Sequence, residues 1–374
     1  MPWIHEREGW PHLTWQSEFL ALKLIAIRHR QGRLLGRMEA LGSELRSEAS
    51  LTTLTADVVQ SSAIEGTQLD PEEVRSSIAR RLGLDTGGLS PASRDVEGIV
   101  EVMLDATQRN DAPLTAERLF GWHAALFPTG RSGIHRITTG AWRPASAGAM
   151  QVVSGPMGRE KVHFQAPDAS RLNAEMAAFL FWFEGCGSLD PVIRAGLAHF
   201  WFVTIHPFED GNGRIARAIA DRALARADNS RERVYSMSAQ LETERNAYYA
   251  ALERQQRDDV DVTPWLDWFL DCLGRSFRSS EHTLESVLYK VRIWEHAHRQ
   301  SVNERQRLVL TRMLHDSRGS INSSKYAKLA KCSTDTALRD IRDLLLRDLL
   351  IQNPAGGRST SYRLPSLEEL HARG

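Results

Sequence analysis

The sequence predicts a mainly α-helical protein that carries one small β-hairpin and ends in a winged helix-turn-helix. Apolar residues recur every three to four positions along most of the 374 residues, which is the period of an amphipathic helix. The exception is residues 138–164, where glycines and a proline surround two short runs of β-prone residues. A chain of this length is expected to form two or three domains.

The first predicted region, residues 1–90, is expected to be helical. Residues 17–45 repeat apolar side chains at the helical spacing, and shorter helices are expected at residues 54–64 and 72–82. Three tryptophans precede these helices and are expected to pack in the core. A Gly-Gly-Leu-Ser-Pro sequence at residues 87–91 ends the region, because glycine and proline interrupt helices.

The second predicted region, residues 91–275, is expected to be a helical core that contains the hairpin. The hairpin pairs residues 150–153 with residues 161–164. A connecting helix at residues 276–300 follows the core. The helices expected in these two regions are residues 92–108, 116–127, 170–184, 191–204, 215–227, 242–254 and 264–299.

The last predicted region, residues 301–374, has the element order of a winged helix-turn-helix. One helix precedes two more, at residues 321–330 and 333–344, and a turn at residues 353–359 leads into a wing strand at residues 361–364. Such a domain can place its second motif helix in the major groove of DNA and contact phosphates with the wing.

DNA binding by this last region stays open. Its basic residues outnumber its acidic ones, which favours contact with phosphates. However, Asp335, Asp340 and Asp343 lie on the expected recognition helix and would face phosphates unfavourably. A packing role or a contact with another protein is the alternative, because a fold does not determine a function.

Composition excludes several classes of protein. The 47 Lys and Arg balance the 47 Asp and Glu, so net charge does not attract the whole chain to nucleic acid or to a membrane. The longest apolar stretches, such as residues 195–208, fall short of the roughly 20 residues that a membrane span needs. The N-terminus lacks a basic start followed by an apolar run, so we expect no signal peptide and a cytoplasmic protein.

Residues 206–217 predict a phosphate site. An apolar helix runs into His206-Pro207, and proline disfavours helix at the preceding residue, so the chain turns there. Gly211 and Gly213 permit close backbone approach before a new helix begins at Arg214. Amides at a helix N-terminus bind anions. A carboxylate beside a polyphosphate is a plausible Mg²⁺ ligand, and an imidazole can accept a proton from an attacking hydroxyl.

This segment also resembles, position for position, the signature HPFx(D/E)GNGRxxR of the Fic (Fido-domain) family of nucleotidyl transferases. The resemblance implies a Fic-type helical core that transfers AMP from ATP to a Ser, Thr or Tyr hydroxyl of a target protein, with ATP and Mg²⁺ bound. It implies that His206 is the general base, that Asp210 binds Mg²⁺ and that Phe208 anchors the loop. It assigns the phosphates to Gly211, Asn212, Gly213 and Arg214, and the γ-phosphate to Arg217.

Two further segments resemble parts of a Fic domain. Residues 140–143 and the predicted hairpin resemble the Fic flap, which holds the target segment by strand addition. Residues 248–252 followed by Gln256 resemble the adenine-side helix, with Tyr248 as the expected base contact. Core packing of both tyrosines at 248 and 249 is the alternative. The residues expected to line the flap are Val153, Ser154, Gly155, Val162 and His163.

Residues 61–66 resemble the inhibitory motif (S/T)xxxE(G/N) found with many Fic domains, with Ser61 and Glu65 in its key positions. Glu65 could form a bidentate, charge-assisted pair with Arg217 and so occupy the group that should bind the γ-phosphate. The N-terminal region also resembles a domain of unknown function attached to some Fic proteins.

Three functions therefore remain. The first is a protein adenylyltransferase restrained by Glu65, acting on an unknown protein substrate and able to modify itself. The second is a DNA-binding regulator whose Fic core senses nucleotide. The third is transfer of another phosphate-containing moiety, or removal of AMP with Glu65 positioning water. The oligomeric state stays open, with a homodimer among the possibilities.

Overall fold

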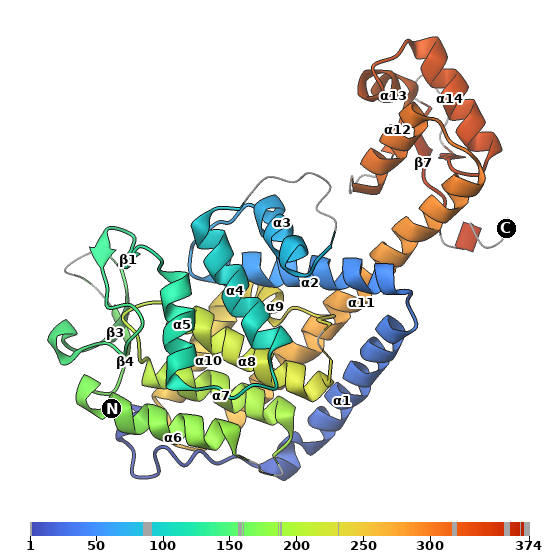
Figure 1. The fold of residues 1–374 in the computed structure, drawn as a ribbon. Helices are drawn as coiled ribbons and strands as arrows, with labels where there is room; N and C mark the ends of the chain where they lie inside the picture. Colours follow the sequence, from blue (N-terminus) through green and yellow to red (C-terminus); the bar gives the residue numbers. More distant parts are fainter. Residues whose placement is uncertain are drawn as a thin grey trace. The chain divides into compact units, whose positions relative to one another are not determined.

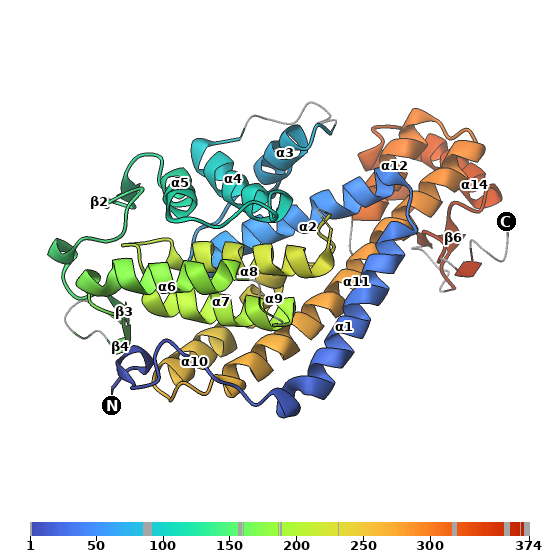
Figure 2. The same ribbon diagram turned by 60° about the horizontal axis from the view of Figure 1, so that its bottom comes forward.

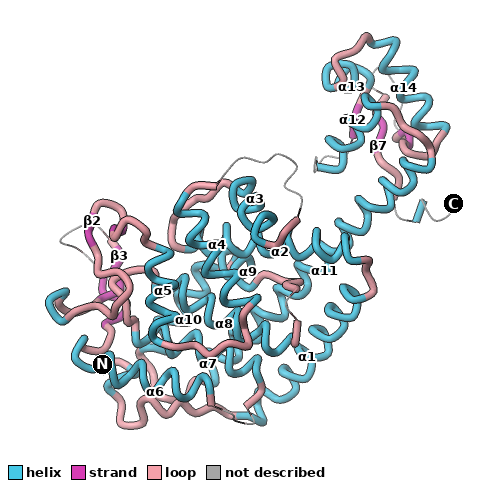
Figure 3. Tube along the Cα trace, viewed as in Figure 1, coloured by secondary structure: helices cyan, strands magenta, loops and turns pink. Residues whose placement is uncertain are grey.

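The computed structural model describes residues 2–84, 92–155, 159, 161–185, 187, 189–230, 232–315, 320–354, 360–366 and 368–369. The chain is mainly helical, as predicted, and its strands form small separate patches (Figures 1 and 3). Internal contacts divide it into two compact units, Met1–Glu281 and His282–Gly374. The break expected at residues 87–91 lies outside the described residues. Helix α11 (Thr263–Arg299) runs without interruption from the first unit into the second.

The N-terminal helices differ from the prediction. The helix expected over residues 17–45 is two helices, α1 (Ser17–Glu39) and α2 (Ser43–Ile64), because Gly42 adopts an extended conformation and serves as the N-cap of α2. Helix α2 therefore begins before the expected residue 54. It packs along α9 (Met237–Thr243), a helix that the sequence did not predict separately.

The other helices of the first unit include α7, which is almost entirely buried. Side chains at the N-caps accept hydrogen bonds from the first-turn amides of several helices, which explains where these helices begin. The helices are α3 (Pro71–Arg81), α4 (Arg94–Gln108), α5 (Ala116–Leu126), α6 (Leu172–Glu184), α7 (Pro191–Ile205), α8 (Asn212–Asp228) and α10 (Arg245–Gln256), with short 3₁₀ turns at Ile4–Glu6, Ala145–Ala147 and Ala169–Arg171.

Helices α7 and α8 form the centre of the first unit. They run side by side in both ribbon views and share the most extensive contact between any two elements (Figure 2). From Val192 onward nearly every residue of α7 is buried, and so is most of α8. The loop that joins them, residues 206–211, is therefore held by two helices that cannot shift independently of the core.

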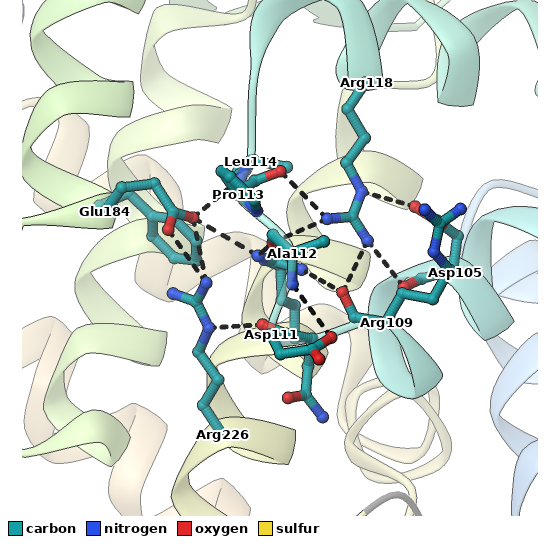
Figure 4. Close-up of polar contacts among 12 residues, drawn as sticks. Asp105, Arg109, Asp111, Ala112, Pro113, Leu114, Arg118, Glu184 and Arg226 are labelled. Carbon is teal, nitrogen blue, oxygen red and sulfur yellow. Dashed lines mark hydrogen bonds and ion pairs between the residues drawn. The ribbon is translucent and has the colours of Figure 1, made fainter.

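A polar brace fixes the loop between α4 and α5. The five N–H groups of Arg118 donate to the Asp105 carboxylate at 2.6 Å and to four backbone carbonyls between residues 105 and 113 at 2.9–3.1 Å (Figure 4). Arg226 of α8 pairs with Glu184 of α6 at 3.0 Å and donates to the Asn110 carbonyl at 2.6 Å. The brace joins α4, α5, α6 and α8, and so positions α5 against the central loop.

In the part of the chain that the structure describes, the strands form three small antiparallel sheets. The predicted hairpin is present as β3 (Gln151–Ser154) and β4 (Lys161–Gln165), with a bulge between Val152 and Val153. A second, shorter hairpin that the sequence did not predict pairs β1 (Arg131–Ser132) with β2 (His135–Arg136).

The second unit has its own apolar core. Helices α12 (Glu304–His315), α13 (Ser323–Leu329) and α14 (Thr334–Leu346) pack with the last part of α11. The sheet has the order β5-β7-β6, formed by Ser320–Ile321, Tyr362–Arg363 and Ile351–Gln352. Much of the predicted wing turn, residues 355–359, lies outside the described residues. The winged-helix assignment itself stays a prediction.

Across the described ranges, the helices are too short or too polar for any of them to cross a lipid bilayer.

Candidate active site

His206 stands where α7 ends. Its backbone is left-handed, with φ 52° and ψ 58°, and its amide closes the last turn by donating to the Phe202 carbonyl at 3.0 Å. The ring Nδ1 lies 3.1 Å from the Val203 carbonyl oxygen, so Nδ1 carries the proton and Nε2 keeps a free lone pair. Burial lowers the pKa of His206, although the Val203 carbonyl opposes the shift. The imidazole is therefore neutral near neutral pH.

The loop after His206 is held by its own side chains. Asn212 accepts a hydrogen bond from the Phe208 amide at 2.9 Å and donates to the Phe208 carbonyl at 2.8 Å. The Phe208 ring is fully buried, in agreement with its expected anchoring role. The side chain of Asn212, which the sequence assigned to the phosphates, is thus engaged in fixing the loop, and its backbone amide is what remains for a ligand.

Helix α8 begins at Asn212, two residues before the start expected at Arg214 and three before the expected range 215–227. Its N-cap is Gly211 with φ 79°, and the N-cap supplies no side-chain hydrogen bond to the first turn. A Cβ at Gly211 would lie 2.9 Å from the Phe127 ring, so only glycine fits there. The amides of residues 212–214 thus form the first turn of a helix with no side-chain cap, an arrangement that attracts anions.

Asp210 is held by three groups, of which Ser132 and His123 were not indicated by the sequence. Its carboxylate accepts hydrogen bonds from the Gly211 amide at 2.6 Å and from the Ser132 hydroxyl in β1. Its carbonyl oxygen lies 3.2 Å from Nε2 of His123 in α5. Because the Gly140 amide donates to Nδ1 of His123 at 3.3 Å, the proton of His123 must be on Nε2, and this nitrogen donates to Asp210.

Arg143 fixes the turn from the other side. It is buried, its Nε donates to the His206 carbonyl at 2.9 Å, and its backbone amide donates to the Pro207 carbonyl at 2.8 Å. A guanidinium N–H also donates to the Pro167 carbonyl, just after β4. The segment that resembles the base of a Fic flap therefore connects the hairpin directly to the His206 turn.

Arg217 meets Ser61 and Glu65 of α2, the two residues that resemble an inhibitory motif. Its Nη2 donates to Glu65 Oε1 at 2.9 Å and to the Ser61 carbonyl at 2.8 Å, and its Nε donates to the Ser61 hydroxyl at 2.9 Å. The expected pair exists, but it is not bidentate, because Ser61 takes the neighbouring positions. Burial alone would lower the pKa of Arg217, but the Glu65 carboxylate together with Tyr248 and Tyr249 outweighs this effect, so the pKa is raised.

The end of α2 explains the position of Glu65. The helix stops at Ile64, and Gly66 takes a left-handed conformation with φ 83°, a common way for a glycine to end a helix. The carboxylate then reaches over α8: a Cβ at Gly213 would lie only 2.1 Å from Glu65 Oε1. Glu65 thus lies against the first turn of α8, where the sequence places the phosphates.

A pocket of about 700 Å³ opens beside this contact. Glu65, Asp210 and Arg214 form part of its lining, together with residues from the loop before α3, from the start of α4 and from the β1–β2 turn. The Arg214 guanidinium also lies over the Phe127 ring, 4.9 Å from its centre. The pocket therefore collects polar groups at one side of the signature loop.

The predicted adenine contacts lie deeper than expected. Tyr248 is only 1% exposed, and its hydroxyl lies 2.8 Å from Nε2 of His199 in α7. Gln256 is buried and donates to the Thr204 hydroxyl at 3.4 Å. Tyr249 is 39% exposed instead, and its hydroxyl donates to the Ile64 carbonyl at 3.3 Å. The structure thus buries Tyr248 and presents Tyr249 beside the inhibitory motif.

The hairpin expected to dock a target has one engaged strand and one open strand. Arg257, which follows α10, donates to the Val162 and His163 carbonyls of β4 at 3.0 and 3.2 Å. His163 is held between the Ser154 hydroxyl at 2.6 Å and the Glu253 carboxylate at 2.7 Å. Val153 on β3 is exposed. Gly155, the residue directly after β3, has a φ of 106°. Within the described residues β3 pairs only with β4, so its outer edge is open.

Two segments of the chain match known families. Residues 113–224 match the Fic/DOC family, and residues 3–84 match a domain of unknown function, DUF4172, in agreement with the resemblance of the N-terminal region. Residues 113–224 form a Fic-family domain. The residues that match the family include the whole signature loop and α5, which carries His123.

Relatives of this chain include proteins named protein adenylyltransferase Fic. The protein of Aedes aegypti is 26% identical over 228 residues, which cover 59% of this chain and 40% of the relative. That of Drosophila virilis is 33% identical over 125 residues, which cover 33% of this chain and 23% of the relative. The chain thus spans two fifths or less of the length of these relatives.

Solved structures show the same fold. A Fic family protein from Desulfovibrio desulfuricans superposes with a TM-score of 0.52 at 20% identity, over 92% of this chain and 96% of that chain. A Fic domain containing signaling protein from Bacteroides thetaiotaomicron superposes with a TM-score of 0.51 at 18% identity, over 69% of this chain and 97% of that chain. The mainly helical Fic fold predicted from the sequence is therefore confirmed.

Proposed function

We propose that this protein transfers AMP from ATP to a hydroxyl side chain of a protein, and that Glu65 restrains the reaction. The observation that carries the proposal is the arrangement of the signature loop. A neutral imidazole with a free nitrogen lies at one end of the loop, and a helix N-terminus without a side-chain cap lies at the other. Relatives named protein adenylyltransferase support the same reaction.

His206 is the proposed general base. Its Nδ1–H is held by the Val203 carbonyl, so Nε2 is the atom that accepts the proton of the target hydroxyl. The hydroxyl oxygen then attacks the α-phosphorus, and pyrophosphate leaves. Because burial lowers the pKa of His206, the base is available in its neutral form near neutral pH.

Asp210 fits a magnesium site. Its carboxylate lines the pocket beside the first turn of α8, and Mg²⁺ prefers one or two carboxylates completed by phosphate oxygens and water. Such an ion would neutralise charge on the phosphates during transfer. The described residues contain no cluster of three His, Cys, Asp or Glu side chains, which is compatible with a metal that takes most of its ligands from the nucleotide.

Arg217 and Arg214 are the proposed cationic phosphate ligands. Arg217 is buried, and its Nη1 has no hydrogen-bond partner in the described structure. Nε of Arg214 is also buried without a partner. A buried, unpaired N–H group is costly, and a phosphate oxygen would satisfy it.

Glu65 is the proposed inhibitory residue. Its carboxylate lies against Gly213 and pairs with Arg217, so a triphosphate in the expected position would meet both a steric obstacle and a like charge. Glu65 is 31% exposed at its side chain and stands at a helix end, so it can be displaced without unfolding the core.

Replacing Glu65 by glycine is therefore expected to raise self-modification with α-labelled ATP and Mg²⁺ by at least tenfold, because one opposing contact of about 1.4 kcal/mol already corresponds to a factor of ten. The same change combined with His206→Ala is expected to abolish labelling. The readouts are gel autoradiography and intact mass.

Glu73→Ala is the matched control, because Glu73 lines the same pocket but lies on α3. Equal labelling of the Glu65→Gly protein and its parent, on every substrate tried, would show that Glu65 does not inhibit the reaction. An adduct with the mass of UMP, phosphate or phosphocholine would reject AMP as the transferred group. Loss of AMP from a pre-modified target only when Glu65 is present would assign removal in place of transfer.

A further inference from the structure

The chain has a net charge of zero because its two units carry opposite formal charges. Residues 282–374 hold 16 Lys and Arg against 10 Asp and Glu, a formal charge of +6. Residues 1–281 hold the other 31 Lys and Arg against 37 Asp and Glu, a formal charge of −6. The AMP-transfer proposal makes no use of the basic unit, whose charge favours a polyanionic partner.

Helix α14 presents one face outward. Ala337, Asp340, Ile341 and Leu344 are buried and point into the core of the second unit. At 100° per residue, the opposite face carries Asp335, Leu338, Arg339, Arg342 and Leu346. Leu346 is 86% exposed, and both arginines are exposed.

The acidic residues that argued against DNA binding are mostly turned away from this face. Asp340 is buried and accepts from Arg305 at 2.9 and 3.2 Å and from the Tyr326 hydroxyl at 3.3 Å. Asp343 accepts from Gln306 at 2.7 Å and from Arg347 at 2.9 Å. Asp340 is thus neutralised inside the unit and the partly exposed Asp343 by its pair with Arg347, so within α14 only Asp335 remains as an unpaired acid on the outward face.

The two outward arginines are free to meet a ligand. Among the described residues neither forms an ion pair, and Arg339 makes only a 3.5 Å contact with Thr336 of its own helix. Helix α13, which packs against α14, adds exposed Lys325 and Lys328, and exposed Lys331 lies in the turn between the helices with φ 48°. The two helices and this turn therefore present five cations that need no displacement.

We propose that residues 282–374 bind double-stranded DNA, with the outward face of α14 in the major groove and the lysines of α13 and the following turn on the phosphates. An exposed helix of this kind fits the major groove of B-DNA, whereas the major groove of A-form RNA is too deep and narrow for side chains to read. Arg339 and Arg342 are the proposed base contacts, because a guanidinium can donate two hydrogen bonds to the O6 and N7 atoms of guanine.

The proposal can be tested on the full chain without ATP. The probe is a fluorescent DNA duplex of mixed sequence, about three helical turns long, titrated by anisotropy between about 50 and 200 mM salt. The expected result is binding that weakens steeply with salt. The Arg339→Ala/Arg342→Ala protein should bind at least about tenfold more weakly. For the Lys325→Ala/Lys328→Ala protein, the slope of log affinity against log salt concentration should be smaller in magnitude by about 2.

Two further variants separate local contacts from general charge. Arg254→Ala/Arg278→Ala removes the same charge from exposed positions of residues 1–281 and should leave the affinity unchanged. Asp335→Asn removes the remaining outward acid of α14 and should tighten binding several-fold. All these positions are exposed, so circular dichroism should report unchanged helix content.

Three results would overturn the proposal. The first is no rise in anisotropy at the lowest salt with about 100 μM protein, which is the weak limit for non-specific DNA binding. The second is an equal loss of affinity in the Arg254/Arg278 control and in the Arg339/Arg342 variant. The third is binding of single-stranded RNA of the same length at least as tightly as the duplex, which would assign a different nucleic acid.

Discussion

At the scale of single residues, His123 contributes to the site although no motif marks it. Its ring stacks on Phe208, with centroids 4.2 Å apart and planes 5° apart, and it bridges the Gly140 amide and the Asp210 carbonyl. Burial lowers the pKa of His123 to about 4. The bridge needs one protonated and one free ring nitrogen, so it depends on the neutral ring.

His123→Phe is expected to keep the stack and lose the bridge. In the Glu65→Gly background, self-modification should fall by about tenfold or more, the usual cost of losing a group that orients a ligand-binding residue. The melting temperature near neutral pH should fall by about 2–4 °C or more, because the Gly140 amide and the Asp210 carbonyl lose their shared partner. His135→Phe, an exposed histidine of β2, is the control. Undiminished labelling of the His123 variant would show that Asp210 needs no support from this ring.

The same substitution predicts a change at low pH. The folded pKa of His123 lies below the unfolded value of about 6.5, so this group contributes stability above that pH and loses it as the pH falls toward 4. As the pH falls from about 6.5 to 4, the melting temperature of the parent should therefore decrease more steeply than that of His123→Phe.

At the scale of elements, helix α2, which carries Glu65, meets α8 through two carboxyl groups. Asp57 of α2 lies beside Asp221 of α8, and Oδ2 of each carboxyl group is buried without a hydrogen-bond partner among the described residues, so we expect the two groups to share one proton. Burial, and then the charge of Asp57, raise the pKa of Asp221 well above its usual range. Arg233 pairs with Asp221 at 2.6 Å, and Ser236 donates to Asp57 at 2.5 Å. Asp221 also lies one helical turn after Arg217.

Asp57→Asn is expected to stabilise the contact at high pH. Because the folded pKa of Asp221 is raised, its contribution to stability is present below about pH 4 and is lost as the pH rises through the folded pKa. An asparagine keeps an acceptor for Ser236 and offers an N–H to Asp221, so no shared proton is needed.

Thermal melting between about pH 5 and pH 9 tests this expectation. As the pH rises, the melting temperature of Asp57→Asn should decrease less than that of the parent. Glu48→Gln, which changes an exposed carboxylate of the same helix, should melt as the parent does. Parallel melting curves for Asp57→Asn and the parent across this range would mean that the two carboxyl groups share no proton.

At the scale of the whole molecule, the chain has two separate apolar cores joined by the continuous helix α11. The second core gathers α12, α13, α14 and the end of α11 around residues such as Leu344 and Ile341. The signature loop, the inhibitory motif and the hairpin all belong to the first unit. A defect confined to the second core should therefore spare the chemistry of the first.

Leu344→Ala tests this separation. It should destabilise the second unit by about 2–5 kcal/mol, the usual cost of such a cavity, and so speed hydrogen exchange of the α14 amides. AMP incorporation in the Glu65→Gly background should stay unchanged. Leu346→Ala, on the exposed face of the same helix, is the control and should alter neither measurement. Reduced AMP incorporation by Leu344→Ala alone would show that the two units depend on each other.

Several features could be predicted from the sequence because their signals are local. The helical spacing, the glycine-rich hairpin and the His-Pro and Gly-Asn-Gly turns each depend on residues a few positions apart. The split of residues 17–45 was missed, because Ala40 and Leu41 continue the helical pattern and only Gly42 interrupts it.

The sequence by itself determined the family, the helical architecture and the loop that carries His206, since these follow from local patterns and a contiguous motif. Only the tertiary structure decided which distant groups support that loop. His123, Ser132 and Arg143 lie at least 63 residues from their loop partners. It also decided that Tyr248 faces inward and that Asp340 is neutralised. Burial and pairing depend on which faces of the helices meet, and this is a property of the packed molecule.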